Sequence, residues 1–283
     1  MKSALSEKVA NSSRKKKSEP AIATWNPADY AANSAVQQSW AGELIARLKL
    51  RGDEHILDVG CGNGKITAEL ATAVPRGLVI GMDASAEMIG FAREKFSVLE
   101  NPNLKFQITD AREIRSPQKF DVFFSNAALH WVDDHEAILR GAASVLKSGG
   151  RLVISCGGKG NAHDVFLALR PEMRLKRWRE FFRRMPMPYY FYAPSDYEKW
   201  LPQAGFRIQR LELSPKDATY AGVTGFATWL RTTWLPFVQR VSDDLREEFI
   251  AAVTQRYVAK HPPDAEGKIL VRMVRLEIDA SKV

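Results

Sequence analysis

Short apolar runs alternate with helical stripes along the first half of the chain. Five runs predict strands, at residues 55–59, 78–82, 104–109, 120–125 and 151–156. The stretches between them place apolar residues three or four positions apart, which predicts helices at 40–48, 65–74, 86–96 and 134–146. Strands that alternate with helices of this length build βαβ units, so we expect an α/β protein with a parallel sheet.

The second half of the chain is less regular. Its pattern predicts helices at 195–204, 222–237 and 242–260 and strands at 206–213 and 269–278. Ser195 and Glu198 have the spacing of a capping box, which favours a helix start there. No clean domain boundary is visible. We therefore expect one domain at residues 24–283, with a core at 55–156 and helical insertions at 157–194 and 216–267.

Positive charge is concentrated at the N-terminus. Residues 1–20 hold six basic and two acidic side chains, which is +4 of the net charge of +8. A solvated, disordered basic tail at residues 1–23 is the simpler interpretation, and a nucleic-acid arm is the alternative. Because the chain has only two cysteines and no apolar run of membrane-spanning length, we expect a cytoplasmic protein without a disulfide framework.

A glycine-rich turn follows the first predicted strand. Its residues are Asp58-Val59-Gly60-Cys61-Gly62-Asn63-Gly64. Glycines at a strand–helix junction permit a sharp turn and a close approach by a ligand. An open α/β sheet binds ligands at the carboxyl ends of its strands, where this turn lies. Lys65 replaces the last glycine of the dinucleotide-binding pattern, so that pattern fails here.

The acid followed by G-x-G-x-G resembles the first motif of the class I S-adenosylmethionine (AdoMet) methyltransferases. The resemblance is clearest over residues 55–156. It implies a Rossmann-like, mostly parallel seven-stranded sheet with helices on both faces and a helical cap from N-terminal and C-terminal insertions. It also implies that the loop, including Cys61 and Asn63, holds the amino-acid part of AdoMet. Cys61 itself reads as a packed residue rather than a nucleophile.

Further cofactor contacts are expected at the ends of the next strands. Asp83 ends the second strand, where a carboxylate can accept bonds from both ribose hydroxyls. The resemblance implies that Asp110 contacts the adenine amino group. The remaining residues expected beside the cofactor are Ala84, Met88, Ala111, Asn126 and Ala127, with Trp25 and Tyr30 from the N-terminal segment.

The segment after the fourth strand reads Ser125-Asn126-Ala127-Ala128-Leu129-His130-Trp131. It is similar to the motif of trans-aconitate methyltransferases and related carboxylate O-methyltransferases. The resemblance implies a small, acidic methyl acceptor. His130 is expected to orient the acceptor or act as a base, with Trp131 beside it. A structural histidine is the alternative. His135 and His163 are expected to be solvated.

Arg231 is the candidate clamp for an acidic acceptor, since a guanidinium binds a carboxylate through two hydrogen bonds. A surface ion pair is the equal alternative. The neighbouring Trp229 and Trp234 read as core residues more readily than as site residues. No set of metal ligands has recognisable spacing, and nothing in the sequence indicates an oligomeric state.

Two rival functions stay open. The stretch at residues 170–184 has seven basic and two acidic residues interleaved with aromatic ones, a composition that could grip nucleic acid. A basic amphipathic helix is the simpler interpretation. The second rival is an AdoMet-binding protein without catalysis. We expect an AdoMet-dependent methyltransferase that O-methylates a small carboxylic acid such as trans-aconitate; another small-molecule acceptor is the alternative within the same activity.

Overall fold

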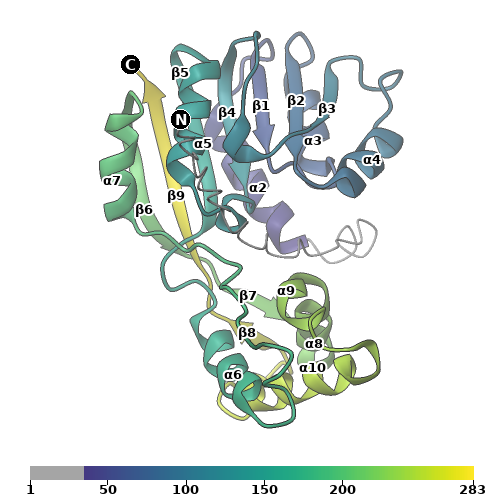
Figure 1. Ribbon diagram of the computed structural model, residues 1–283. Coiled ribbons are helices and arrows are strands. Elements are labelled where there is room, and N and C mark those ends of the chain that lie inside the picture. Colours follow the sequence, from purple (N-terminus) through teal and green to yellow (C-terminus); the bar gives the residue numbers. More distant parts are fainter. Residues whose placement is uncertain (1–34) are drawn as a thin grey trace, which may run out of the picture.

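The computed structural model describes residues 35–283, and a seven-stranded sheet forms its centre. The strand order is β3-β2-β1-β4-β5-β9-β6, and only β9 runs against its neighbours. The bounds are β1 His55–Val59, β2 Leu78–Asp83, β3 Leu104–Ile108, β4 Phe120–Asn126, β5 Leu146–Gly157, β6 Phe206–Pro215 and β9 Val274–Lys282. This is the predicted Rossmann-like architecture (Figure 1).

Helices cover both faces of the sheet, because the buried strands present apolar side chains on both sides. One face packs against α2 (Ala35–Leu48), α3 (Lys65–Ala73) and α4 (Ala86–Lys95). The other packs against α5 (His135–Val145) and α7 (Pro194–Gln203). The short 3₁₀ helices η1 (Ala111–Glu113) and η2 (Leu129–Trp131) follow β3 and β4. The predicted helices on both faces are confirmed.

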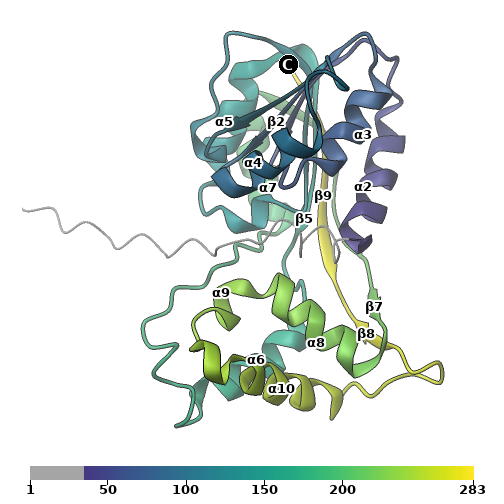
Figure 2. The ribbon, with the colours of Figure 1, turned by 90° about the vertical axis from the view of Figure 1, so that its right-hand side faces the viewer.

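A second body, which we call the helical lobe, is formed by residues 158–193 and 216–273 (Figures 1 and 2). It contains α6 (His163–Arg174), β7 (Ala218–Tyr220), α8 (Gly222–Thr233), α9 (Leu235–Val238), α10 (Asp243–Val258) and β8 (Ile269–Val271). Strands β7 and β8 pair with each other rather than with the main sheet. The lobe has an apolar core of its own, rich in aromatic rings. Two stretches far apart in sequence therefore fold together.

Several predicted boundaries were wrong. The single strand expected at 269–278 is two strands, β8 and β9, which belong to different sheets. Apolar and polar residues keep alternating across the break between the two strands. The sequence pattern therefore cannot show that the chain changes from one sheet to another. The helix expected at 222–237 ends at Thr233 and restarts as α9. Pro236 lies in the first turn of α9, where proline is tolerated, and it could not continue α8.

Three further expectations need correction. The basic stretch 170–184 is helical only to Arg174, because the chain then turns so that Trp178 and Phe182 enter the lobe core. Helix α5 ends at Val145 and β5 begins at once at Leu146, not at residue 151 as the apolar run predicted. Helix α7 begins at Pro194, where the Ala193 N–H donates to the Asp196 carboxylate at 2.8 Å.

No helix within residues 35–283 has the length and apolar character needed to cross a membrane. The expected tail at residues 1–23 lies outside the described residues.

Candidate active site

The loop of residues 60–64, here called the glycine loop, is anchored by its own backbone. The Gly60 and Cys61 N–H groups both donate to the Met82 carbonyl of the neighbouring strand, at 2.7 and 3.0 Å. Gly60, Gly62 and Gly64 have φ values of 76°, 54° and 79°. Non-glycine residues adopt this left-handed conformation only at a cost, which explains the glycines. The loop is a rigid bend at the carboxyl end of β1.

The three glycines differ in what surrounds them. A Cβ on Gly60 would lie 2.1 Å from the Ala128 Cβ, and one on Gly64 would lie 2.7 Å from the Phe106 ring. A Cβ on Gly62 would meet no atom within 4 Å. Gly60 and Gly64 are therefore required by the protein's own packing. Gly62 borders open space, as a glycine does where a ligand approaches the backbone.

Asp83, at the end of β2, joins the glycine loop to α4. Its carboxylate accepts from the Gly62 N–H and from the Ser85 N–H, both at 2.9 Å. Each carboxylate oxygen has more than one acceptor direction, so these bonds leave capacity for ribose hydroxyls. Burial raises the pKa of Asp83, while its bonds to backbone N–H groups oppose the shift. The side chain holds the loop in addition to its expected contact with the cofactor.

Asp58 lies beneath the glycine loop and is almost fully buried, at 2% exposure. The Thr67 hydroxyl of α3 donates to its carboxylate at 2.7 Å. Burial raises the pKa of Asp58 to about 7; the Thr67 bond opposes this shift and the nearby Asp83 charge adds to it. Two acids close together favour a cationic ligand, because a positive charge stabilises their ionised forms.

Asp110 follows β3 and caps η1 by accepting from the Arg112 N–H at 2.8 Å. The Arg112 side chain also donates to this carboxylate, at 2.6 and 3.0 Å, and it lowers the pKa of Asp110. Ala111 is the first residue of η1. The Asp110 carboxylate is thus ionised and oriented at the edge of the site, with Arg112 as a partner that sequence reasoning missed.

The other residues expected beside the cofactor occupy the same strand ends. Cys61 is buried, and burial raises the pKa of its thiol well above the usual value, which suits a packed side chain. The Asn63 side chain accepts from the Lys65 N–H at 3.3 Å. Met88 is buried and its N–H donates to the Ser85 hydroxyl, which caps α4. Ala84 is exposed beside Asp83.

Strained backbone marks the end of β4. Ala127 has a φ of 57°, in the left-handed region that a residue with a Cβ adopts only at a cost. Its N–H donates to the Ser155 carbonyl at 2.8 Å, which holds the conformation. Such strain is common at ligand sites. Asn126, one residue earlier, directs its side-chain oxygen toward Arg275 at 3.2 Å.

His130 lies in η2 and its protonation state is set by the neighbouring strand. The Gly157 N–H donates to His130 Nδ1 at 3.3 Å, so Nδ1 is an acceptor and the neutral ring carries its proton on Nε2. Burial lowers the pKa of His130 to about 3, and the positive charge of Arg275 adds to the shift. At neutral pH the ring is therefore a hydrogen-bond donor through Nε2 and a poor base.

Aromatic side chains surround His130. Its ring centroid lies 5.5 Å from Trp131, 6.1 Å from Tyr189 and 5.9 Å from Phe191. Tyr189 and Phe191 stack on each other, and Tyr189 also packs against Trp131 at 4.6 Å. Sequence reasoning missed Tyr189 and Phe191. The run of four aromatic residues at 189–192 could have drawn attention to this segment. Nothing in its spacing indicated contact with His130.

Arg275, on β9, is a second residue that sequence reasoning missed. It is 4% exposed and donates to Ser155 Oγ, the Ser155 carbonyl and Asn126 Oδ1. Its guanidinium also lies over the Trp40 ring of α2, 5.1 Å from the centroid. The alternating pattern of the last strand indicates that the Arg275 side chain faces one side of the sheet. It does not reveal which side chains of other elements Arg275 contacts.

The structure does not bring Arg231 to this group. Arg231 pairs with Glu247 of α10 on the outside of the lobe, and both side chains are more than one-third exposed. This is the surface ion pair, not the clamp. Trp229 and Trp234 are buried in the lobe core, as expected. His163 is exposed, as expected, but His135 is buried and bonded to Tyr197 and the Leu129 carbonyl, so the solvated interpretation of His135 was wrong.

Trp25 and Tyr30 lie outside the described residues. Within residues 35–283, no group of three or more His, Cys, Asp or Glu side chains is arranged to hold a metal ion.

Comparisons with known proteins agree with this geometry. Residues 50–180 match the family model "Methyltransferase domain". A curated relative described as an uncharacterized methyltransferase, from Schizosaccharomyces pombe, is 33% identical over 66% of this chain and 72% of its own length. A trans-aconitate 2-methyltransferase from Variovorax paradoxus is 30% identical over 91% of this chain and 98% of its own.

Solved structures show the same fold. The YcgJ protein of Bacillus subtilis superimposes with a TM-score of 0.60 at 18% identity, covering 87% of this chain and 98% of its own. The likeness to the curated relatives extends over residues far beyond the glycine loop. The chain therefore belongs to the class I AdoMet-dependent methyltransferases and uses AdoMet to methylate a small molecule.

Proposed function

We propose that this enzyme transfers the methyl group of AdoMet to a carboxylate oxygen of a small acid such as trans-aconitate. The observation that carries the proposal is how much of the chain aligns with carboxylate methyltransferases. Trans-aconitate 2-methyltransferases match the chain at 26–30% identity over 90–92% of its length, the helical lobe included. A match confined to the cofactor-binding half would say nothing of the acceptor.

The strand ends supply a consistent cofactor site. Gly62 leaves open space above the loop, and we assign that space to the amino-acid part of AdoMet. Asp83 then lies at the position of the ribose and Asp110 at that of the adenine, with Asn126 and Ala127 toward the methyl group. When bound, AdoMet supplies a sulfonium whose carbon–sulfur bond breaks as the acceptor oxygen attacks the methyl carbon.

His130 fits the role of orienting the acceptor rather than deprotonating it. A carboxylate is already ionised at neutral pH and needs no base. The neutral His130 ring offers its Nε2–H, which can donate one hydrogen bond to the reacting carboxylate. Trp131, Tyr189 and Phe191 limit access of water to the reacting atoms. Because the product ester carries no charge, methyl transfer proceeds without a proton transfer.

The test combines an acceptor screen with two histidine variants. Mass spectrometry should detect an AdoMet-dependent methyl ester from trans-aconitate or a related acid, but no product from the matching amides. His130→Ala should lower kcat/KM by ~10-fold or more, since one oriented hydrogen bond is lost. His163→Ala alters an exposed histidine and is the control. The rate should show no inflection near pH 6.5, because burial lowers the pKa of His130 to about 3.

If His130 acts as a base, kcat/KM of the wild type should fall on acidification with an apparent pKa between 5 and 8. The His130→Ala variant should then lack this pH dependence. Methylation of amines or phenols in preference to every acid would reject the carboxylate proposal.

A nucleic-acid acceptor is disfavoured by the structure of residues 170–184. Trp178 and Phe182 are buried against Phe249 of α10, so neither ring is available to stack on a base. Within the same stretch Arg177 pairs with Glu248. The stretch covers the lobe core and pairs in part with α10.

A further inference from the structure

Arg112 lies in η1 and binds two acids that follow different strands. Its backbone N–H and its Nε donate to Asp110 Oδ1, at 2.8 and 3.0 Å, and its Nη2 donates to Oδ2 at 2.6 Å. Its Nη1 donates to Asp133 Oδ1 at 3.1 Å. Asp110 follows β3, whereas Asp133 follows β4 and η2. One guanidinium therefore fixes the Asp110 carboxylate and is itself held by a second part of the chain.

The bonds from Arg112 leave the Asp110 carboxylate one open acceptor position. A carboxylate has about four such positions, two on each oxygen. Oδ1 already accepts from two N–H groups and Oδ2 from one, and within residues 35–283 no other group donates to either oxygen. The Asp110 side chain is 34% exposed, so the remaining position on Oδ2 is accessible to a ligand.

The open position suits the amino group of a nucleoside base. An ionised carboxylate accepts hydrogen bonds but donates none. The Arg112 side chain lowers the pKa of Asp110 by its hydrogen bonds, which keeps the carboxylate in this form. The amino group of adenine carries a donor for such an oxygen, and a base without that group has none at the same place. Hydrogen bonds to a charged acceptor are short and strong, so a fixed Oδ2 makes affinity depend on the base.

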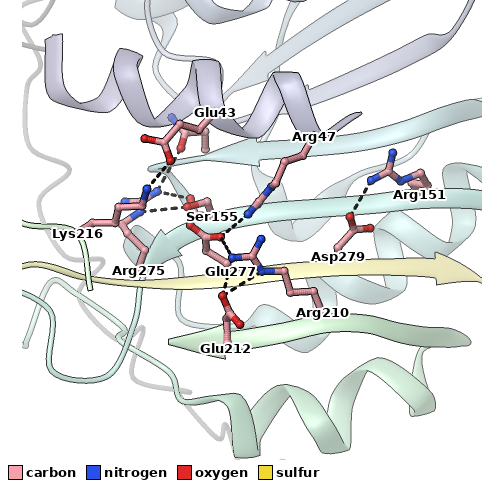
Figure 3. A network of polar contacts seen from close by, with 11 residues as sticks. Glu43, Arg47, Arg151, Ser155, Arg210, Glu212, Lys216, Arg275, Glu277 and Asp279 are labelled. Atoms are coloured by element: carbon pink, nitrogen blue, oxygen red, sulfur yellow. Dashed lines mark hydrogen bonds and ion pairs between the residues drawn. The ribbon is translucent and has the colours of Figure 1, made fainter. Parts of the chain in front are cut away.

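A second group of ion pairs provides a contrast. Figure 3 shows the network between α2, β5, β6 and β9, in which Arg47 binds Glu277 at 2.6 Å and Arg151 binds Asp279 at 2.7 Å. The side chains of Glu277 and Asp279 are 7% and 18% exposed, so these pairs join elements of the fold and leave a ligand little access. Asp110 is more exposed and lies at the proposed position of the adenine, which favours a role in binding.

We propose that Arg112 is a positioning residue for adenine recognition: it holds the Asp110 carboxylate so that the open position on Oδ2 receives the adenine amino group. The inference rests on the proposed place of the adenine at Asp110 and does not depend on the identity of the methyl acceptor. Arg112 acts through Asp110 rather than by touching the cofactor. Without the guanidinium, the carboxylate is free to rotate toward water, and its bond to the amino group weakens.

Equilibrium binding of S-adenosylhomocysteine to the full chain tests this role. Isothermal titration would compare it with the analogue in which hydrogen replaces the adenine amino group. The wild type should prefer S-adenosylhomocysteine by ~10-fold or more, because the analogue cannot donate to the charged acceptor. Arg112→Gln should weaken S-adenosylhomocysteine to near the affinity of the analogue and leave the analogue within ~2-fold. Arg112→Lys should keep part of the preference, because lysine retains the charge but not the two-pronged geometry.

A double-mutant cycle separates positioning from direct contact with the cofactor. Asp110→Ala should abolish the preference, and adding Arg112→Gln to that variant should change neither affinity by more than ~2-fold. Arg151→Gln is the matched control, since it breaks an ion pair between β5 and β9, and it should keep the full preference. Affinity for the analogue reports whether each variant is folded.

Three results would overturn the inference. An unchanged preference in Arg112→Gln would show that Asp110 needs no positioning, and an equal loss for both ligands would assign Arg112 a bracing role only. A further loss on adding Arg112→Gln to Asp110→Ala would show that Arg112 acts independently of Asp110. A wild type without any preference would remove the adenine from Asp110, and the inference with it. Failure to methylate any carboxylic acid would instead reject the proposed function and leave this inference standing.

Discussion

The strand ends and the helical lobe stabilise themselves by opposite means. At the strand ends, buried acids and glycines in the left-handed conformation are held by backbone hydrogen bonds, as at Asp83 and Gly62. The lobe has a core of interlocking aromatic rings, with Trp234 lying 4.9 Å from Phe166 and 5.6 Å from Tyr189. The first region holds buried acids, Asp58 and Asp83, whose ionised forms a cationic ligand can stabilise. The second is apolar, so it packs without help from a ligand.

On this basis we propose separate tasks for the two regions. The two buried acids support a site built for a cationic cofactor. Apolar walls such as Trp131 and Tyr189, which meet at 4.6 Å, support a site that excludes water from an acceptor. Substitutions in one region should therefore change one ligand's affinity and not the other's.

The largest effect is expected at the glycine loop, where two glycines can be compared. Gly60→Ala places a Cβ 2.1 Å from Ala128 in a left-handed conformation and should destabilise the fold by ~3–5 kcal/mol. Gly62→Ala meets no protein atom within 4 Å and should cost only ~1–2 kcal/mol. Its AdoMet affinity should nevertheless fall more than ~10-fold, or about 1.4 kcal/mol.

Urea unfolding and calorimetric titration with AdoMet measure the two quantities separately. Undiminished AdoMet binding by a folded Gly62→Ala variant would show that the open space beside Gly62 is not the cofactor site.

In the lobe, Trp234→Ala should lower the free energy of unfolding by ~3–5 kcal/mol, because a large ring is removed from a packed core. AdoMet affinity should stay within ~2-fold, while the KM for the acceptor rises. Arg231→Ala is the control in the same helical region; the exposed pair with Glu247 is worth ~0.2–1 kcal/mol, and the acceptor KM should not change. An equal loss of AdoMet and acceptor affinity in Trp234→Ala would contradict the separation of tasks.

A smaller effect, and one that depends on pH, is expected at Asp58. Its pKa is about 7 in the folded protein against 3.8 for the unperturbed side chain. Between these values the folded state holds a proton that the unfolded state has lost, so stability falls as the pH rises from about 4 to about 7. Asp58→Asn should match the wild type near pH 4 and exceed it at pH 8, by at most ~4 kcal/mol.

The same variant should bind AdoMet more weakly at pH 8, because the cation loses a negative neighbour. Chemical unfolding at a series of pH values gives the slope, and titration calorimetry gives the affinity. A wild-type stability that does not fall over this range would place the Asp58 pKa near its ordinary value.

The cofactor half of this protein was readable from the sequence, since its signals are local. The glycine loop, the acid at the end of β2 and the alternation of strands and helices each depend on neighbouring residues, and backbone geometry turns them into fixed positions. The confirmed sheet and its cofactor follow from that locality.

The proposed acceptor side was decided only by tertiary structure. The ring of aromatic side chains around His130 joins residues about 60 positions apart, and Arg275 meets Asn126 across 149 positions. No short-range pattern encodes such contacts. Three other features have the same origin, since each depends on which distant surface a segment or side chain meets. They are the change of strand partner between β8 and β9, the turn of Trp178 into the lobe core and the pairing of Arg231 with Glu247.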